Sequence, residues 1–181
     1  MHAALIELVE SLPPADETGE RHRAEALAWL RATDDVHRRV KPATPSPHLV
    51  VYFLLVDRVA GLVLLCDHRL SGLRLPTGGH VEPGEDPADA VRREAQEELG
   101  LRVADVAAPF LVTVTETVGA PPSRHTDVTL WYALPVPSTA PLVPDEREFA
   151  GVRWWSRVEV AAARPGRFEP HLLRALDALG L

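Results

Sequence analysis

Residues 79–101 read GHVEPGEDPADAVRREAQEELGL, and this stretch gathers the carboxylates of Glu94, Glu97 and Glu98 into about one turn of a predicted helix. Residues three and four positions apart on a helix face one another, and like charges there cost roughly 0.2–0.5 kcal/mol per pair. A helix that carries such a cluster beside a glycine-rich turn is typical of a cation site. Mg²⁺ prefers carboxylate, carbonyl and water oxygens and often shares them with substrate phosphates.

The ends of this helix are also marked in the sequence. Asp86 is suited to the N-cap, and Pro87 suits the first helical position, where a missing N–H costs nothing. Gly100 stands where a left-handed C-cap belongs. An apolar stripe at helical spacing predicts the buried face, with the three glutamates on a different face; its members are Ala88, Val91, Ala95 and Leu99.

The whole stretch resembles the Nudix box, G-x5-E-x7-R-E-U-x-E-E-x-G-U, in which U is an apolar residue. Ala95 and Leu101 take the two U positions, and Ala95 is a small residue for the first of them. The resemblance extends beyond the box over roughly residues 48–160. The fixed positions of the box are filled by Gly79, Glu85, Arg93, Glu94, Glu97, Glu98 and Gly100.

The resemblance implies an enzyme of the Nudix hydrolase family, which uses water to cleave a phosphoanhydride bond in a nucleoside diphosphate-linked substrate. It implies Mg²⁺ as the cofactor, with Mn²⁺ as a substitute. A nucleoside triphosphate or related nucleotide is the expected substrate, on family frequency rather than on any residue of this chain.

The resemblance also suggests roles for the box residues. Glu97 and Glu98 would be metal ligands, joined by the backbone carbonyl of Gly78, and Glu94 would be a ligand or the base that orients the water. Arg93 would orient a neighbouring glutamate, and Glu85 would brace the loop or join the outer shell of the metal. The expected catalytic set is therefore Glu94, Glu97, Glu98 and Arg93, and the expected metal set is Gly78, Glu94, Glu97 and Glu98.

Three residues outside the box are candidates for substrate binding. Arg69 could pair bidentately with a phosphate, or it could be an ordinary exposed loop arginine. His125 and Asp127 alternate on one face at the start of a predicted strand, where they could bind a base, a ribose or a metal. Polar pairs at a strand edge also serve solubility alone.

Some family members supply a further carboxylate from a downstream loop. The candidates here are Asp145, Glu146 and Glu148, with Glu116 a weaker one; each also fits a plain solvated acid.

Composition limits the classes of protein to be considered. The 181 residues suit one domain with a substantial core, and the net charge of −7 argues against a nucleic-acid or basic membrane-surface binder. The single cysteine, Cys66, excludes an intramolecular disulfide and fits a reducing, cytoplasmic setting. No apolar run approaches the roughly 20 residues of a membrane span. These features predict a cytoplasmic protein with a small-molecule substrate and neither nucleic acid nor membrane as a partner.

The chain divides into three parts by pattern. We expect a helical N-terminal extension at 1–40, a Pro-rich connector at 41–47 and the Nudix hydrolase domain at 48–181. The extension could form a homodimer contact, cover the active site, or simply pack on the main body. The predicted fold is α/β, an α/β/α sandwich with a mixed β-sheet plus the extension. Outside the box, helices are expected at 2–12, 17–31, 157–163 and 168–179, strands at 48–57, 62–66, 73–75, 110–118, 126–136 and 151–155, and a loop at 119–125.

Two other functions are alternatives to a hydrolase. A nucleotide-binding or regulatory module on the same fold usually lacks box glutamates, whereas this chain has all of them. An isomerase of the isopentenyl diphosphate type relies on a catalytic cysteine, and Cys66 lies inside an apolar strand without a matching motif. The sequence therefore favours the hydrolase.

Overall fold

The structure is a computed structural model that describes residues 2–41, 44–118, 123–164 and 166–181. Residues 42–43 of the predicted connector and residues 119–122 of the predicted loop lie outside the described residues. The helices are α1 (His2–Ser11), α2 (Glu17–Ala32), α3 (Pro87–Leu99), α4 (Arg157–Ala162) and α5 (Leu172–Ala178). The strands are β1 (His48–Asp57), β2 (Leu62–His68), β3 (Arg74–Leu75), β4 (Thr77–His80), β5 (Leu111–Glu116), β6 (Thr126–Pro135) and β7 (Phe149–Ser156).

Strand β1 is the centre of a mixed sheet. It pairs in parallel with β6, from His48 opposite Asp127 to Val56 opposite Pro135. Its other edge is shared by two antiparallel partners, β4 against residues 50–53 and β2 against residues 56–57. The sheet continues from β2 to β3 and β7, and from β6 to β5. Within the described residues the strands form an open sheet of seven, as the predicted fold class requires.

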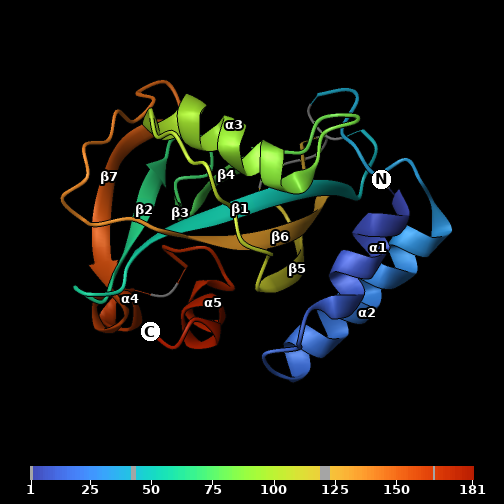
Figure 1. Cartoon of the computed structure of the whole chain (residues 1–181), viewed down its shortest axis with the longest axis horizontal. Helices are drawn as coiled ribbons and strands as arrows, with labels where there is room; N and C mark the ends of the chain where they lie inside the picture. The colour runs from blue at the N-terminus through green and yellow to red at the C-terminus, as the bar shows by residue number, and fades with distance from the viewer. Residues whose placement is uncertain (1, 42–43, 119–122, 165) are drawn as a thin grey trace.

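Helices cover both faces of this sheet (Figure 1). Successive side chains of a strand point to opposite faces. Thus Leu49 and Phe53 of β1 pack in a core cluster with side chains of α1, α2 and α3, whereas Leu54 and Val56 pack in a second cluster with α4 and α5. The predicted α/β/α sandwich is confirmed.

The two N-terminal helices contribute to the main core. Leu5 and Val9 of α1 and Leu30 of α2 belong to the same buried cluster as the sheet, and α2 lies against β5. Asp16 caps α2 by accepting a hydrogen bond from the Gly19 N–H. The extension therefore packs on the main body, which was one of the three roles considered for it.

Helix α3 begins and ends as the sequence predicts. The Asp86 side chain accepts a hydrogen bond from the backbone N–H of Ala88, and Gly100 adopts the left-handed conformation with φ of 65°. Val91, Ala95 and Leu99 are buried as expected, whereas Ala90 rather than Ala88 completes the stripe. Ala88 instead lines a cavity between α1 and the first turn of α3.

Two elements differ from the prediction. Strand β4 was not expected, because Thr77-Gly-Gly-His80 has a single β-branched residue, two glycines and no alternating pattern. Helix α5 begins at Leu172 and not at Phe168, because Phe168 bridges to Arg74 of β3 and the Glu169 N–H donates to the Arg74 carbonyl. Among the described residues, no helix is both long and apolar enough to span a bilayer.

The close contact of β4 with β1 depends on Gly78. Its φ is +146°, and a Cβ there would overlap the Val51 carbonyl oxygen of β1. We therefore expect Gly78→Ala to lower the free energy of unfolding by at least about 2 kcal/mol, measured by urea denaturation. The matched control is Gly151→Ala in β7, where a Cβ meets only Asp67 at an ordinary distance; its effect should stay within about 0.5 kcal/mol. Equal unfolding midpoints for the two variants would contradict this account.

Candidate functional site

Glu98 is the most deeply placed of the three box glutamates. It is 5% exposed, and its Oε2 accepts a hydrogen bond of 2.8 Å from the backbone N–H of Gly78. Glu94 is half-buried beside Gly79, where any Cβ would overlap the Glu94 carboxylate. Glu97 is exposed. The three box glutamates therefore differ in burial, from exposed Glu97 to Glu98 at the contact between α3 and β4.

The buried position makes negative charge on Glu98 costly. Burial, with smaller contributions from the carboxylates of Glu94 and Glu148, raises the pKa of Glu98 from 4.5 to about 9, against the opposing hydrogen bond from the Gly78 N–H. Burial also raises the pKa of Glu94, although the Arg93 guanidinium opposes that rise. The protein alone thus holds more carboxylates at this contact than it can stabilise as anions.

Arg93 links the glycine-rich loop to the glutamates. Its guanidinium donates to both carboxylate oxygens of Glu85 at 2.8 and 2.9 Å, to Glu94 Oε1 at 2.7 Å and to the His80 carbonyl at 3.0 Å. Glu97 Oε2 lies 3.4 Å away. These contacts raise the pKa of Arg93, chiefly through the hydrogen bonds that it donates to Glu85. Arg93 therefore contacts both Glu85 and Glu94, and Glu85 also accepts a hydrogen bond from the Glu82 N–H.

The chemical nature of these side chains, rather than their spacing, fits a hard divalent cation, since the compact ligand group found among the described residues is a different one. The side-chain donors are all carboxylate oxygens, which suit Mg²⁺ or Mn²⁺. The raised pKa of Glu98 shows that its charge is uncompensated by protein groups, and a cation would supply that compensation. Glu97 and Glu98 would hold it, with Gly78 at the adjoining turn and Glu94 beside them.

Of the downstream acids, Glu148 is the one that approaches the box. Its charge raises the pKa of both Glu98 and Glu94. Asp145 instead binds the Arg147 guanidinium, while its backbone N–H donates to the Glu98 carbonyl and so ties this loop to α3. Glu116 lies at the end of β5 and faces Arg124 at 3.8 Å.

Arg69 is held next to the same downstream loop. Its backbone N–H donates to the Glu148 carbonyl, and its Nε donates to the Glu146 carbonyl at 2.9 Å. The side chain is exposed. The structure therefore places the Arg69 guanidinium against the backbone of the loop that carries Glu148.

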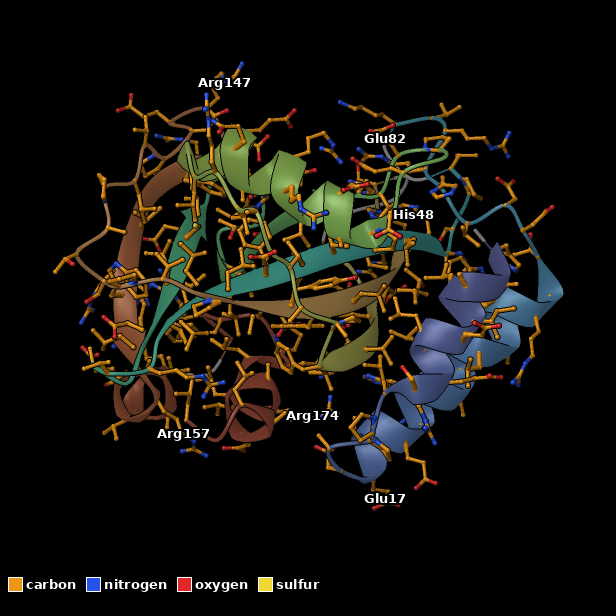
Figure 2. The ribbon with its side chains drawn as sticks, in the orientation of Figure 1. Glu17, His48, Glu82, Arg147, Arg157 and Arg174 are labelled. Atoms are coloured by element: carbon orange, nitrogen blue, oxygen red, sulfur yellow. The ribbon has the colours of Figure 1, made fainter. Side chains whose placement is uncertain are left out.

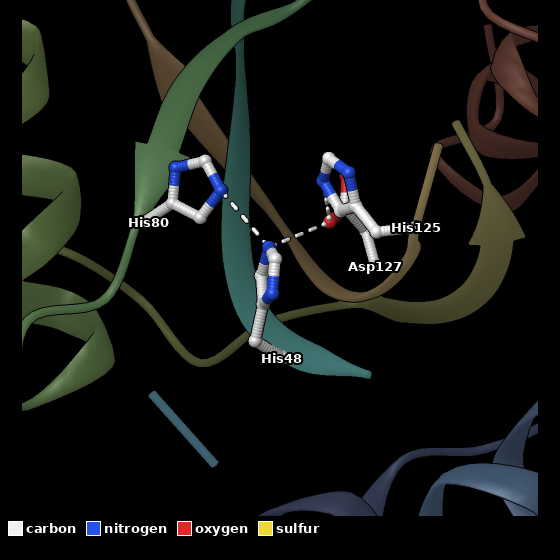
Figure 3. A group of neighbouring side chains, drawn as sticks. All are labelled: His48, His80, His125 and Asp127. Atoms are coloured by element: carbon white, nitrogen blue, oxygen red, sulfur yellow. Dashed lines mark hydrogen bonds and ion pairs between the residues drawn. The ribbon is translucent and has the colours of Figure 1, made fainter. Parts of the chain in front are cut away.

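His125 and Asp127 lie elsewhere, in a second cluster. Figure 3 shows them with His48 and His80, all pointing toward one another. Asp127 Oδ1 lies 3.2 Å from Nε2 of His48 and 3.2 Å from Nε2 of His125. Sequence reasoning found His125 and Asp127 but missed His48 and His80. The only local signals for the missed pair were a histidine opening an apolar strand and a histidine directly after Gly78-Gly79.

The two groups of residues lie toward opposite ends of α3. In Figure 2, Arg147 marks the loop that carries Glu148 at one end of the helix, and His48 lies near the other end with Glu82. His80 follows Gly79 in β4, so the two residues face opposite sides of the sheet. Gly79 faces Glu94, and His80 faces away from the box.

A cavity of about 520 Å³ opens between α1 and the start of α3. Its walls are mainly apolar, and it reaches Glu85 and Asp86 but none of the three box glutamates of α3. Its lining lacks those carboxylates, so this cavity is separate from the box glutamates of α3.

Cys66 and Trp131 have packing roles. Cys66 is buried in β2, and burial raises the pKa of its thiol well above the ordinary value, so the isomerase reading gains no support. Trp131 is fully buried, and its Nε1–H donates to Thr113 Oγ1 at 2.9 Å.

Comparison with known proteins identifies one protein family. The NUDIX domain family model matches residues 46–176. No curated protein matches the sequence.

Several solved structures are similar to this one. A NUDIX-family hydrolase from Clostridium perfringens is 25% identical, with 74% of this chain and 96% of that one covered and a TM-score of 0.55. The Escherichia coli dihydroneopterin triphosphate pyrophosphohydrolase is 18% identical, with 71% and 90% covered and a TM-score of 0.59. A Caenorhabditis elegans Ap4A hydrolase is 14% identical, with 73% and 94% covered and a TM-score of 0.55.

The raised pKa of Glu98 predicts how stability depends on pH in metal-free protein. Between 4.5 and about 9 the folded protein keeps a proton on Glu98 that the unfolded chain releases, so stability falls as pH rises through this range. Glu98→Gln removes the titrating group and keeps an oxygen for the Gly78 N–H. From pH 5 to pH 8 the wild type should lose about 2–4 kcal/mol more than this variant, measured by denaturant unfolding in chelator.

Burial also raises the pKa of Glu169, to about 8, but Glu169 is present in both proteins and cancels in the difference. Parallel pH profiles for wild type and Glu98→Gln would show that Glu98 is ionised without a metal.

Proposed function

Because the chain belongs to the NUDIX domain family, we propose that it is a divalent-metal-dependent hydrolase that cleaves a phosphoanhydride bond in a nucleotide. The observation that carries this proposal is the buried Glu98 carboxylate, with its pKa raised to about 9 among the carboxylates of Glu94 and Glu148. Such an arrangement destabilises the empty protein and favours a bound cation. A module that only binds nucleotide would have no need for it.

The proposed chemistry assigns one task to each group. Glu97, Glu98 and the Gly78 carbonyl would hold Mg²⁺, with Mn²⁺ as a substitute. The bound ion would neutralise phosphate charge and lower the pKa of a water molecule. Glu94 would join as a ligand or act as the base that accepts the proton of the attacking water, and its raised pKa favours the second task.

Arg93 acts on the reaction through Glu94. It holds Glu94 Oε1 at 2.7 Å while Glu85 and the His80 carbonyl fix the guanidinium from the other side. The second carboxylate oxygen, Oε2, is then the one that would face the water. Arg93 is therefore a positioning residue in this proposal.

We propose a nucleoside triphosphate or related nucleotide as the substrate. Two of the similar structures carry the names of a triphosphate pyrophosphohydrolase and an Ap4A hydrolase, but identities of 18% and 14% show a shared fold alone. Arg69 is exposed beside the loop of Glu148 and could contact a substrate phosphate. The net charge of −7 favours a small molecule over a nucleic acid.

The decisive experiment is a panel of nucleotides assayed with Mg²⁺, with Mn²⁺ and with chelator. The panel holds nucleoside triphosphates, oxidised triphosphates, ADP-ribose, sugar nucleotides and dinucleoside polyphosphates, and released phosphate is measured after coupling to a pyrophosphatase or phosphatase. Wild type should turn over one class only when metal is present. Glu98→Gln should lose about 10³-fold or more in kcat/KM while its circular dichroism stays unchanged.

Glu146→Gln is the matched control, because Glu146 is an exposed acid whose backbone carbonyl, not its side chain, contacts Arg69. It should retain wild-type turnover. Retained activity in Glu98→Gln would overturn the metal assignment. Nucleotide binding without any turnover across the panel would instead support a ligand-binding module.

Arg93→Lys tests the positioning role. Lysine keeps the positive charge but cannot contact Glu85, Glu94 and the His80 carbonyl at once, so Mn²⁺ affinity measured by calorimetry should fall by about 10- to 100-fold. The control is Arg92→Lys on the neighbouring position, where the arginine contacts Asp89 and the Ala104 carbonyl rather than the box glutamates. If both variants bind Mn²⁺ like wild type, Arg93 is only a structural brace.

A further inference from the structure

Three strands bring His48, His80, His125 and Asp127 to one place. His48 is the first residue of β1 and is the direct register partner of Asp127 in the parallel strand β6. His80 is the last residue of β4, which pairs with β1 on its other edge. His125 comes two residues before Asp127 and faces the same way. The cluster therefore lies at one end of the sheet, on the face opposite to α3.

The hydrogen bonds of two histidines fix which ring nitrogen carries the proton. Nδ1 of His48 lies 2.7 Å from the Pro45 carbonyl, and Nδ1 of His125 lies 2.7 Å from the Ser123 carbonyl. A carbonyl only accepts, so both Nδ1 atoms must be donors. In each neutral ring Nε2 then carries a lone pair, and both lone-pair nitrogens lie beside Asp127. Metal-binding histidines are held in this way, by donating their second N–H to a carbonyl or carboxylate.

Asp127 Oδ1 is the unexplained atom of the cluster. It is buried and receives no hydrogen bond from any described residue, although Nε2 of His48 and Nε2 of His125 each lie 3.2 Å away. A buried carboxylate oxygen without a donor is costly. With neutral rings, three electron-pair donors at these distances repel one another; either protonated imidazoles, which would donate to Asp127 as ion pairs, or a cation between the three groups relieves that repulsion.

The spacing also matches a small coordination sphere. The four ligand atoms all lie within 4.8 Å of one another, and Nε2 of His80 lies 3.0 Å from Nε2 of His48. A tetrahedral zinc site with metal–ligand distances of about 2.0–2.1 Å has ligand–ligand edges of about 3.3 Å. The separations of 3.0 and 3.2 Å are close to that value, whereas the widest pairs, at up to 4.8 Å, must close by about 1.5 Å through side-chain rotation.

A purely structural hydrogen-bond network explains the cluster less well. It accounts for His80, which can donate Nε2–H to Nε2 of His48. With neutral rings it leaves Asp127 Oδ1 without a donor, although His48, which has no exposed surface, lies 3.2 Å from that oxygen. A metal ion would satisfy all four groups at once.

We propose that His48, His80, His125 and Asp127 form a second metal site, for a transition metal of the zinc class. Imidazole nitrogens favour such metals, whereas the carboxylates beside α3 favour Mg²⁺ or Mn²⁺. Four protein ligands leave no open position, which is the pattern of a structural site. The ion would join the beginnings of β1 and β6 to the end of β4, and so fix the strand that leads out of the proposed catalytic site.

The test uses full-length protein without a histidine tag, stripped with chelator and returned to buffer containing excess Mg²⁺. Zn²⁺ is titrated by calorimetry, and Co²⁺ is titrated while visible absorption reports a tetrahedral environment. We expect one equivalent of each metal to bind, with intense Co²⁺ bands. Zn²⁺ at about 100 times its Kd should raise the Tm by about 5–10 °C.

Variants separate the two sites. His125→Ala and Asp127→Asn should each weaken Zn²⁺ binding by at least about 100-fold and abolish the Co²⁺ bands. Glu98→Gln, in the other group, should keep both. His37→Ala is the histidine control, because His37 lies outside the cluster with its Nδ1 3.1 Å from the Val81 carbonyl.

Each result decides the matter, because none of these readouts depends on hydrolysis. Absence of stoichiometric Zn²⁺ binding by folded wild type would overturn the proposal, as would equal binding by wild type, His125→Ala and Asp127→Asn. Loss of the Co²⁺ bands in Glu98→Gln alone would move the metal to the box carboxylates. A site retained in Glu98→Gln stands even if the nucleotide panel shows no turnover.

Discussion

The position of one acid side chain, Glu98, joins the fold of this protein to its proposed chemistry. Helix α3 must present Glu98 to the Gly78 N–H while Val91, Ala95 and Leu99 stay in the core. That is possible only if β4 lies flat against β1, which requires glycine at 78. The loop at 145–148 then packs on the end of α3 and brings Glu148 toward the same carboxylate. Helix α3, Gly78 and the loop at 145–148 thus together determine the surroundings of the Glu98 carboxylate.

The parts of the fold that were predicted from sequence are those with local signals. Strand β1 was expected at 48–57 and is found at those residues, because an unbroken apolar run between a Pro-rich connector and a turn has few other uses. The bounds of α3 follow from Asp86 and Gly100. By contrast, β4 and the start of α5 depend on backbone pairing with distant strands, which no local pattern reveals. The burial of Glu98 could not be predicted either. The helical pattern places Glu98 outside the apolar stripe, and its burial depends on β4, which the sequence did not reveal.

The box glutamates and the histidine cluster also differ in how far they could be predicted from sequence. The box residues lie within 23 positions, so their spacing alone indicated that Glu94, Glu97 and Glu98 act together. Among three acidic candidates in the downstream loop, only the structure shows that Glu148 approaches them. The histidine cluster comes from distant parts of the chain, and its members meet only because β1 and β6 pair in parallel at a register that sets His48 opposite Asp127. Spacing in sequence carries no information about that register.

The pairing of β1 also has a consequence for how the chain is made. β1 is apolar on both faces, and its antiparallel partners β2 and β4 follow it soon in the chain. Its parallel partner β6 emerges from the ribosome only after α3 and β5 have been synthesised. Until then one long edge of an apolar strand has unpaired N–H and C=O groups, which is the kind of surface that recruits other nascent chains into aggregates. The order of translation therefore leaves this edge of β1 open to such contacts until residues 126–135 arrive to pair with it.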